Sequence, residues 1–237
     1  MKKEGFSLIE LLLVLGFSLL VFAAAFEFFG ITQRFFFKLK DAEEDNLAIQ
    51  AALSKMRIDL LRAGFGLELA VRAGAVEGLK ASDSLVLLSQ EARYLLAADC
   101  ATGERRISLE KTSGLEAGDR VCLADEQKAE RHSISALEGN TVILSEPLER
   151  SYAVAEARVL LLEEVSYFLD PRTSIIRRKV NSSPAQPLLD NAGQFEFTYL
   201  KENNLVEVRL ADKNHMERAH ELSVFPTNLG LIRPLAR

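Results

Sequence analysis

The segment that decides the fold is GFSLIELLLVLGFSLLVFAAAF, residues 5–26. From residue 6 to residue 26 it is apolar except for Glu10 and two serines. At about 1.5 Å per residue, a helix of this length spans roughly the 30 Å hydrocarbon core of a bilayer. The sequence therefore predicts a membrane-spanning helix that carries a single carboxylate near its start.

The residues that flank this segment predict an orientation. Lys2 and Lys3 precede the apolar run, and the positive-inside rule places them in the cytoplasm. We therefore expect a single-pass membrane protein whose N-terminus is cytoplasmic and whose C-terminal domain is extracytoplasmic. A secretory signal is the competing interpretation, because residues 11–22 have the length of an h-region and residues 23–25, all alanine, resemble a cleavage site.

The sequence after residue 25 favours one long helix over a cleaved signal. Apolar residues step by four and three in turn, as they do along one face of a helix. This apolar seam comprises Phe35, Leu39, Ala42, Asn46, Ile49, Leu53, Met56 and Leu60. No proline occurs before Pro147, and the run Gly64-Phe65-Gly66 supplies a helix stop. We predict a helix over residues 6–63, with its transmembrane part at 6–29, and expect the acidic run at 41–46 to be a solvated face without a binding role.

Short strands separated by turn residues follow Gly66. Six runs are candidate strands: residues 84–90, 105–110, 119–124, 131–137, 141–145 and 158–169. Alternating apolar residues predict two further antiparallel strands with one face on the long helix: Phe195, Phe197 and Tyr199, then Val206, Val208 and Leu210. The predicted fold class is α+β, with the long helix packed on an antiparallel sheet of the domain at 64–237. Turns within residues 114–148 predict a small barrel-like β-subdomain inserted at about 100–158.

Cys100 and Cys122 are the only cysteines. An even number of cysteines in an oxidising compartment favours a disulfide between them. Two buried thiols are the alternative. A metal site is not expected, because two cysteines without paired histidines provide too few ligands.

Several kinds of chemistry have no support in the sequence. His132, His215 and His220 belong to no catalytic or metal-binding motif, and there is no phosphate-binding loop or dinucleotide-binding turn. We therefore expect no enzymatic activity, no cofactor and no metal. The formal charge of −5, with lysine and arginine scattered among acids, makes nucleic acid an unexpected partner.

The N-terminal residues resemble a known signal. Gly5 followed by Phe6, and then SLIELLLVL with Glu10 at its fixed spacing, resembles the class III signal of type IV pilins and of the pseudopilins of type II secretion. The resemblance implies that a prepilin peptidase removes residues 1–5 by cutting between Gly5 and Phe6 and then N-methylates Phe6. It also implies that Glu10 pairs with the Phe6 ammonium of a neighbouring subunit during assembly.

The rest of the chain resembles one branch of that family more loosely. SKMRIDLLRAGFGL, residues 54–67, is similar to the helix end of PilW-type minor pilins and of the related J-type minor pseudopilins. Residues 163–180, 187–200 and 204–211 resemble the strand succession of their C-terminal halves.

This resemblance implies a minor pilin that helps to prime a type IV pilus and stays at or near its tip. Its expected partners are prepilin peptidase, the other minor pilins, the major pilin, the inner-membrane assembly platform and the membrane itself. A minor pseudopilin of type II secretion is the close alternative. A membrane-anchored extracytoplasmic binding module is a second alternative, from a different class of function.

Overall fold

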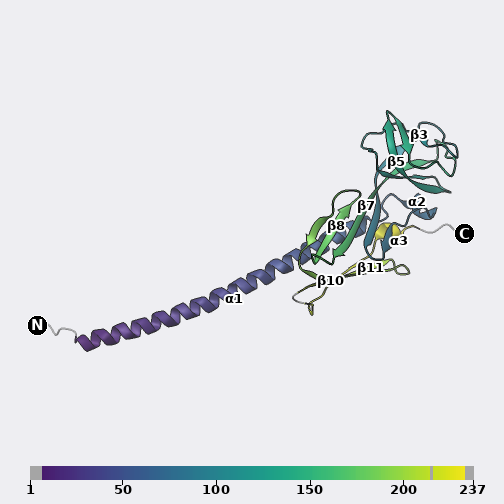
Figure 1. Cartoon of the computed structure of the whole chain (residues 1–237). Coiled ribbons are helices and arrows are strands. Elements are labelled where there is room, and N and C mark those ends of the chain that lie inside the picture. Colours follow the sequence, from purple (N-terminus) through teal and green to yellow (C-terminus); the bar gives the residue numbers. More distant parts are fainter. Residues whose placement is uncertain (1–6, 214–215, 233–237) are drawn as a thin grey trace, which may run out of the picture. The chain divides into compact units, whose positions relative to one another are not determined.

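The computed structural model describes residues 7–213 and 216–232. The chain divides into two compact units, Met1–Gln50 and Ala51–Arg237. Helix α1, Leu8–Arg62, is the one secondary-structure element described for the first unit (Figure 1). Its residues after Gln50 belong to the second unit. The predicted long N-terminal helix is confirmed, and its described part begins two residues after the predicted start at residue 6.

The end of α1 is fixed by backbone contacts to the domain. Gly64 has a φ of +79°, which an L side chain adopts only with strain, and its N–H donates to the carbonyl of Leu88 at 2.7 Å. The side-chain amide of Asn228 donates to the carbonyl of Leu61, one of the last four carbonyls of the helix, at 2.8 Å. The helix therefore stops where the predicted glycine pair stands, with its end held by distant segments.

The second unit is built on a nine-stranded sheet in which all pairings are antiparallel. Its order is β1-β2-β7-β4-β5-β6-β3, and β8 pairs with β7 and β9. The strands are β1 Leu79–Ala81, β2 Leu85–Leu95, β3 Arg106–Ser108, β4 Arg120–Ala124, β5 Ala129–Glu138, β6 Thr141–Leu144, β7 Arg158–Asp170, β8 Ile175–Val180 and β9 Gln186–Leu189. All six candidate strands therefore occur, with ends shifted by a few residues.

Two strands of this sheet bury both faces. On β4, Val121 and Leu123 belong to one hydrophobic cluster, whereas Cys122 and Ala124 belong to another. The first cluster also takes side chains from β2, β3, β5, β6 and β7. The second includes Leu67 and residues of the short helix α2, Glu68–Arg72, which the sequence analysis did not predict. Residues 121–124 of β4 and 159–162 of β7 therefore read as short continuous apolar runs, as expected where a strand is covered on both sides.

Strands β3 to β6 lie within residues 100–158, where the inserted β-subdomain was predicted. They are not a separate sheet, because β4 also pairs with β7 in the order given above.

A second, three-stranded sheet has the order β10-β11-β12 and completes the domain with the one-turn helix α3, Thr227–Gly230. Its strands are β10 Ala192–Leu200, β11 Leu205–Asp212 and β12 His220–Val224, and all pairings are antiparallel. Val206, Val208 and Leu210 are fully buried, so the alternation predicted for β11 is confirmed.

Candidate functional site

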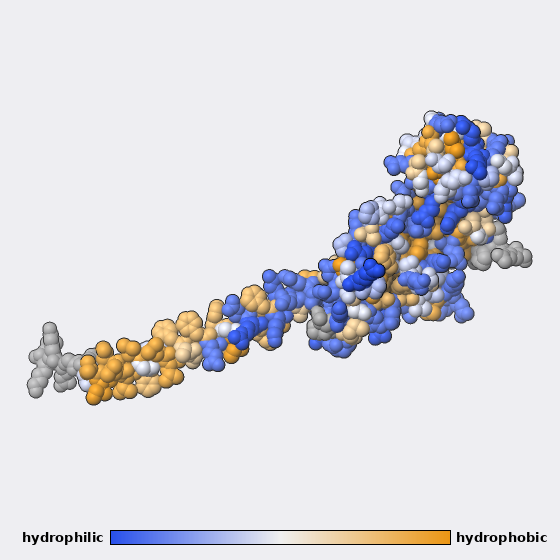
Figure 2. All heavy atoms as spheres, viewed as in Figure 1, coloured by the Kyte–Doolittle hydropathy of each residue, from blue (hydrophilic) through white to orange (hydrophobic). Residues whose placement is uncertain are grey.

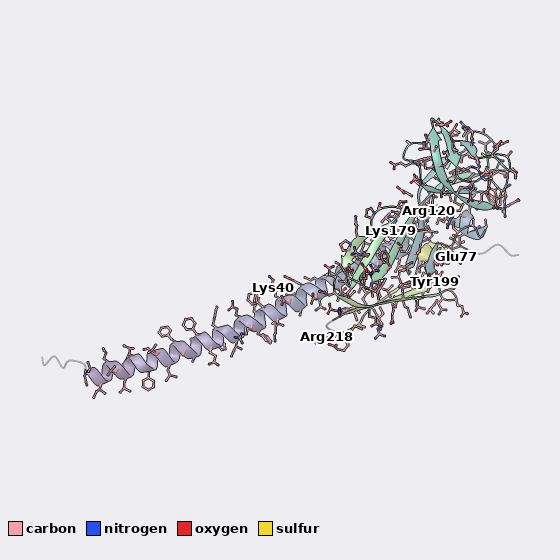
Figure 3. All side chains as sticks on the ribbon, viewed as in Figure 1. Lys40, Glu77, Arg120, Lys179, Tyr199 and Arg218 are labelled. Atoms are coloured by element: carbon pink, nitrogen blue, oxygen red, sulfur yellow. The ribbon has the colours of Figure 1, made fainter. Side chains whose placement is uncertain are left out.

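The first half of α1 exposes its apolar side chains. Figure 2 shows them along the visible face of the N-terminal part of the helix, and Figure 3 shows side chains projecting from it. Between Leu8 and Ile31 the exposed fraction of the large hydrophobic side chains ranges from 54% for Leu15 to 75% for Leu8 and Phe26. Among the described residues, α1 is the one helix long and apolar enough to cross a membrane, and its apolar window is 0% buried. Its composition fits a membrane anchor or a signal.

The energetic cost of this exposure in water is large. Burying one large apolar side chain is worth about 1.5–3 kcal/mol. Summed over the exposed side chains of this segment, the cost is on the order of 30 kcal/mol, which exceeds the typical 5–15 kcal/mol stability of a whole domain. The first half of α1 therefore requires lipid or other apolar helices around it.

Glu10 lies in the first turn of α1 and is exposed. It is the one charged residue between Leu8 and Phe26. The hydroxyl of Ser18, in the same segment, donates a hydrogen bond to the carbonyl of Val14 at 2.8 Å, so it has a partner within the helix. No ion pair found within the described part of the chain includes Glu10. In an apolar environment its carboxylate needs a cation from outside this stretch of helix.

Gly5 and Phe6 lie outside the described residues. The cleavage between them and the methylation of Phe6 therefore stay predictions.

The predicted disulfide between Cys100 and Cys122 is wrong: both thiols are free and buried. Cys100 lies in the hydrophobic cluster that includes Val121 and Leu123, but Cys122 points into the other cluster. Successive side chains of a strand point to opposite faces, so the backbone of β4 directs Cys122 away from the cluster that holds Cys100. Burial raises the pKa of Cys100 to about 11 and that of Cys122 to about 12.

These raised pKa values predict slow alkylation of the native protein. At pH 8 both groups remain thiols, and the thiolate is the reacting form. We expect almost no iodoacetamide labelling of the folded chain, and two labels per chain after denaturation without reductant. Mass spectrometry measures the labels, and a denatured chain that takes none until it is reduced would restore the disulfide.

A buried polar cluster that the sequence analysis missed fixes the last turns of α1 to the domain. Asp59 is 4% exposed, and its Oδ2 accepts hydrogen bonds from Tyr167 on β7 at 2.5 Å and from Arg178 on β8 at 2.7 Å. Burial and the bond to Asp59 raise the pKa of Tyr167. Burial lowers the pKa of Arg178, but its bonds to Asp59 and Tyr167 outweigh this and raise it overall. An acid on the helix face that carries Met56 and Leu60 was the available signal.

A second buried carboxylate has a structural task. Glu130 on β5 accepts hydrogen bonds from the backbone N–H groups of Glu149 at 2.8 Å and Arg150 at 3.3 Å, which holds the loop before β7. Its Oε2 lies 3.0 Å from Nε2 of His132, which is buried.

The structure places His220 on β12, and His215 lies outside the described residues. Across residues 7–213 and 216–232, no three histidine, cysteine or acidic side chains are grouped to hold a metal.

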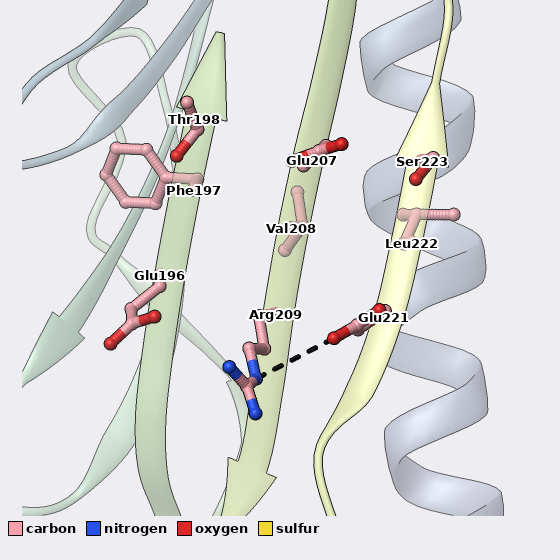
Figure 4. A pocket seen from close by; sticks show the side chains of 9 residues that line it. All are labelled: Glu196, Phe197, Thr198, Glu207, Val208, Arg209, Glu221, Leu222 and Ser223. Carbon is pink, nitrogen blue, oxygen red and sulfur yellow. Dashed lines mark ion pairs between the residues drawn. The ribbon is translucent and has the colours of Figure 1, made fainter.

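A depression of about 250 Å³ lies over the three-stranded sheet (Figure 4). Its polar side chains form two rows across the strands, Glu196-Arg209-Glu221 and Thr198-Glu207-Ser223. Arg209 Nε lies 3.9 Å from Glu221 Oε1. This surface is shallow and mostly acidic, and the exposed half of α1 is the stronger candidate for a functional surface.

Comparison with known proteins gives no family. No family model matches the chain, and no curated protein matches it. Among solved structures, it is similar to the Gp54 tailspike of Acinetobacter baumannii bacteriophage AP22 at 18% identity over 32% of this chain, with a TM-score of 0.30. It is also similar to the gp61 tailspike of Pseudomonas phage phi297 at 20% identity over 31% of this chain, with a TM-score of 0.28. The matches cover 15% and 14% of those two chains.

Proposed function

We propose that this chain is a minor pilin, a structural subunit that helps to prime a type IV pilus and sits at or near its tip. The observation that carries the proposal is the start of α1, residues 8–26, which is exposed, is apolar on all sides and has Glu10 as its single charged residue. A helix of this kind suits both environments of a pilin, first the bilayer and then a bundle of like helices in the fibre. The resemblance of residues 5–15 to a prepilin signal supports the same conclusion.

Glu10 has a physical role in this proposal. A charged carboxylate within a bilayer costs about 2.5–3.5 kcal/mol at the helix centre on insertion scales, and less near the interface. The Phe6 ammonium of an adjacent subunit, created by leader removal, is the cation that offsets this cost in the fibre. The carboxylate thereby favours association with a neighbour that is already in place.

We predict that Glu10→Leu leaves processing and membrane insertion intact, because the helix becomes more apolar. The neighbour's ammonium then stays unpaired in a water-poor environment, at a cost of about 3 kcal/mol, as when one partner of a buried pair is removed. Recruitment to the other minor pilins should fall accordingly, and co-purification from membranes measures it.

The matched control is Leu11→Ala, which alters the same helical turn without touching the carboxylate. It should retain most of the recruitment. Full recovery of Glu10→Leu with the other subunits would contradict the proposed pairing.

Mass spectrometry of the mature N-terminus tests the proposed function most directly. A chain that begins with N-methylated Phe6 supports the pilin. An intact Met1 favours a membrane-anchored binding module, and a chain that begins after Ala25 favours a secreted protein.

A minor pseudopilin of type II secretion uses the same helix, so a separate experiment distinguishes it. Presence of the protein in sheared surface fibres supports the pilus. Loss of enzyme secretion in a deletion strain, without loss of pili, supports the secretion system.

A further inference from the structure

Six strands of the large sheet close into a barrel, on which Figure 1 labels β3 and β5. Each strand in the order β2-β7-β4-β5-β6-β3 pairs with the next, and the chain directly after β2 meets the chain directly after β3. This contact is an antiparallel bridge between Leu96 and Leu109. Beside it, the N–H of Ala97 donates to the carbonyl of Ser108 at 2.8 Å. A hydrophobic cluster with side chains from all six strands fills the interior, so a ligand of the barrel binds on its outside.

A depression of about 410 Å³ lies next to this closure, where two segments diverge. One segment is the loop of residues 98–105, and the other is β3. Ile107 of β3 points into the hydrophobic cluster, so Arg106 and Ser108 point outward. The lining residues are Ala98, Asp99, Cys100, Glu104, Arg105, Arg106 and Ser108. The volume of the depression lies within the range of small-molecule binding sites, about 300–1,000 Å³.

Backbone hydrogen bonds fix this loop to the segment before β7. Cys100 and Tyr152 exchange two such bonds, at 2.9 and 2.8 Å. The N–H of Gly103 donates to the carbonyl of Leu148 at 2.8 Å. The N–H of Leu148 in turn donates to the carbonyl of Glu104 at 2.8 Å. The loop is therefore already ordered, which lowers the entropic cost of binding a ligand.

The two carboxylates at the depression are oriented by the backbone. Asp99 Oδ1 accepts a hydrogen bond from the N–H of Val154 at 2.8 Å. Glu104 Oε2 accepts one from the N–H of Ala101 at 2.9 Å. Within the described residues, the other oxygen of each carboxylate has no hydrogen-bond partner. Each of the two side chains therefore presents one oriented acceptor.

The free donors at the depression come from Arg105 and Ser108. Arg106 is committed elsewhere, because its Nη2 lies 2.6 Å from Oε2 of Glu138. In the part of the chain that the structure describes, the guanidinium of Arg105 and the hydroxyl of Ser108 take part in no ion pair and donate no hydrogen bond. Free donors and free acceptors therefore face the same depression.

This combination of groups selects against charged ligands. An anion meets the free carboxylate oxygens of Asp99 and Glu104, and a cation meets the guanidinium of Arg105. Burial raises the pKa of Cys100 to about 11, so its thiol adds no charge at neutral pH. An apolar ligand leaves these polar groups without partners, which is costly once they are covered. A hydroxyl group fits, because it both donates and accepts.

We propose that this depression binds an uncharged saccharide. Its hydroxyl groups donate to the free carboxylate oxygens of Asp99 and Glu104. Other hydroxyls of the same ligand accept from Arg105 and Ser108. A sugar ring holds several hydroxyls in fixed directions, so it engages oriented partners with little loss of conformational freedom. The inference goes beyond the proposed function in pilus assembly and does not depend on it.

Saturation-transfer NMR on the full chain tests this site. The chain is held in a detergent without a sugar head group, and the probes are glucose, galactose and N-acetylglucosamine. Glucuronate, galacturonate, glucosamine and galactosamine provide the same rings with a charge. We expect saturation transfer to at least one uncharged sugar, and weaker transfer to its charged counterparts. Transfer to none of the uncharged sugars overturns the proposal, as does stronger transfer to a uronate or to an amino sugar.

Variants place the bound sugar in the depression. Arg105→Ala removes a charged donor and should weaken the binding of that sugar about tenfold. Asp99→Asn keeps an oxygen for the N–H of Val154 but turns the free acceptor into a donor, so it should also weaken binding severalfold. The matched control is Arg93→Ala, because Arg93 is an exposed arginine of β2 that does not line the depression. Its affinity should equal that of the unchanged chain.

Titration followed by the same NMR signal gives the dissociation constants. Equal affinities of Arg105→Ala and the unchanged chain, or an equal loss in Arg93→Ala, would show that the sugar binds elsewhere and overturn the site.

The N-terminal mass of the same samples keeps the two proposals apart. A chain that begins with N-methylated Phe6 but binds no sugar leaves the pilin function standing and contradicts only the saccharide site. A chain that retains Met1 and binds the sugar supports the site and contradicts the pilin function.

Discussion

In the Gly5→Val variant we expect the unprocessed precursor to accumulate in the inner membrane, with no protein in fibres. The peptidase must approach the backbone between Gly5 and Phe6, and the β-branched side chain of valine obstructs that approach and restricts the backbone. The retained leader also keeps Lys2 and Lys3 on the helix, and these charges hold it at the cytoplasmic face of the membrane. The intact mass of the membrane-extracted chain measures the result.

Gly5→Ala is the control for this prediction, because its methyl group is the smallest side chain that can be added. It should be processed at least in part. If Gly5→Val yields N-methylated Phe6 and fibres at the normal level, the cleavage site lies elsewhere and the pilin proposal loses its main support.

The long helix and most of the strands were predictable because their signals are local. A proline-free run with four-three apolar spacing predicts a helix, and Gly64 has the positive φ that ends it. Turn residues separate the six candidate strands, so their positions were confirmed with small shifts at the ends. Helix α2 was missed because a five-residue helix is too short to show a period, and it forms where α1 stops and Leu67 is buried.

The disulfide between Cys100 and Cys122 was wrongly predicted for a related reason, because no local pattern marks the face that Cys122 occupies. Residues 121–124 of β4, VCLA, are apolar without alternation, since both faces of the strand are buried there. Nothing local then shows which face Cys122 occupies. The even number of cysteines suggested a disulfide. The alternation of side chains along β4 instead points Cys122 away from the cluster that holds Cys100.

The Asp59 cluster was beyond sequence reasoning because its members are far apart in the chain. Tyr167 lies 108 residues from Asp59, and Arg178 lies 119 residues from it. Their meeting depends on the pairing of β7 with β8 and on how the end of α1 is held, both of which are tertiary facts. The sequence showed only an acid on an apolar helix face.

We predict that Asp59→Ala lowers the free energy of unfolding of the domain by about 3 kcal/mol, as expected when one partner of a buried charge pair is removed. The substitution leaves Arg178, whose side chain is only 18% exposed, without its carboxylate, and leaves the buried hydroxyl of Tyr167 without its acceptor. It also opens space where Asp59 stood. Urea unfolding of the full chain in detergent, followed by circular dichroism, measures the loss.

Three further variants identify the cause of that loss. Tyr167→Phe removes one hydrogen bond but keeps the ion pair, so it should cost about 1 kcal/mol. Asp59→Asn keeps an oxygen acceptor but removes the charge. Its loss of stability should lie between those of Tyr167→Phe and Asp59→Ala. Lys55→Ala removes the more exposed partner of Asp59, which lies 3.5 Å away and is 43% exposed, so it should have a small effect. Equal losses for Asp59→Ala and Tyr167→Phe would show that the hydroxyl, and not the buried charge pair, holds the last turns of α1 to β7 and β8.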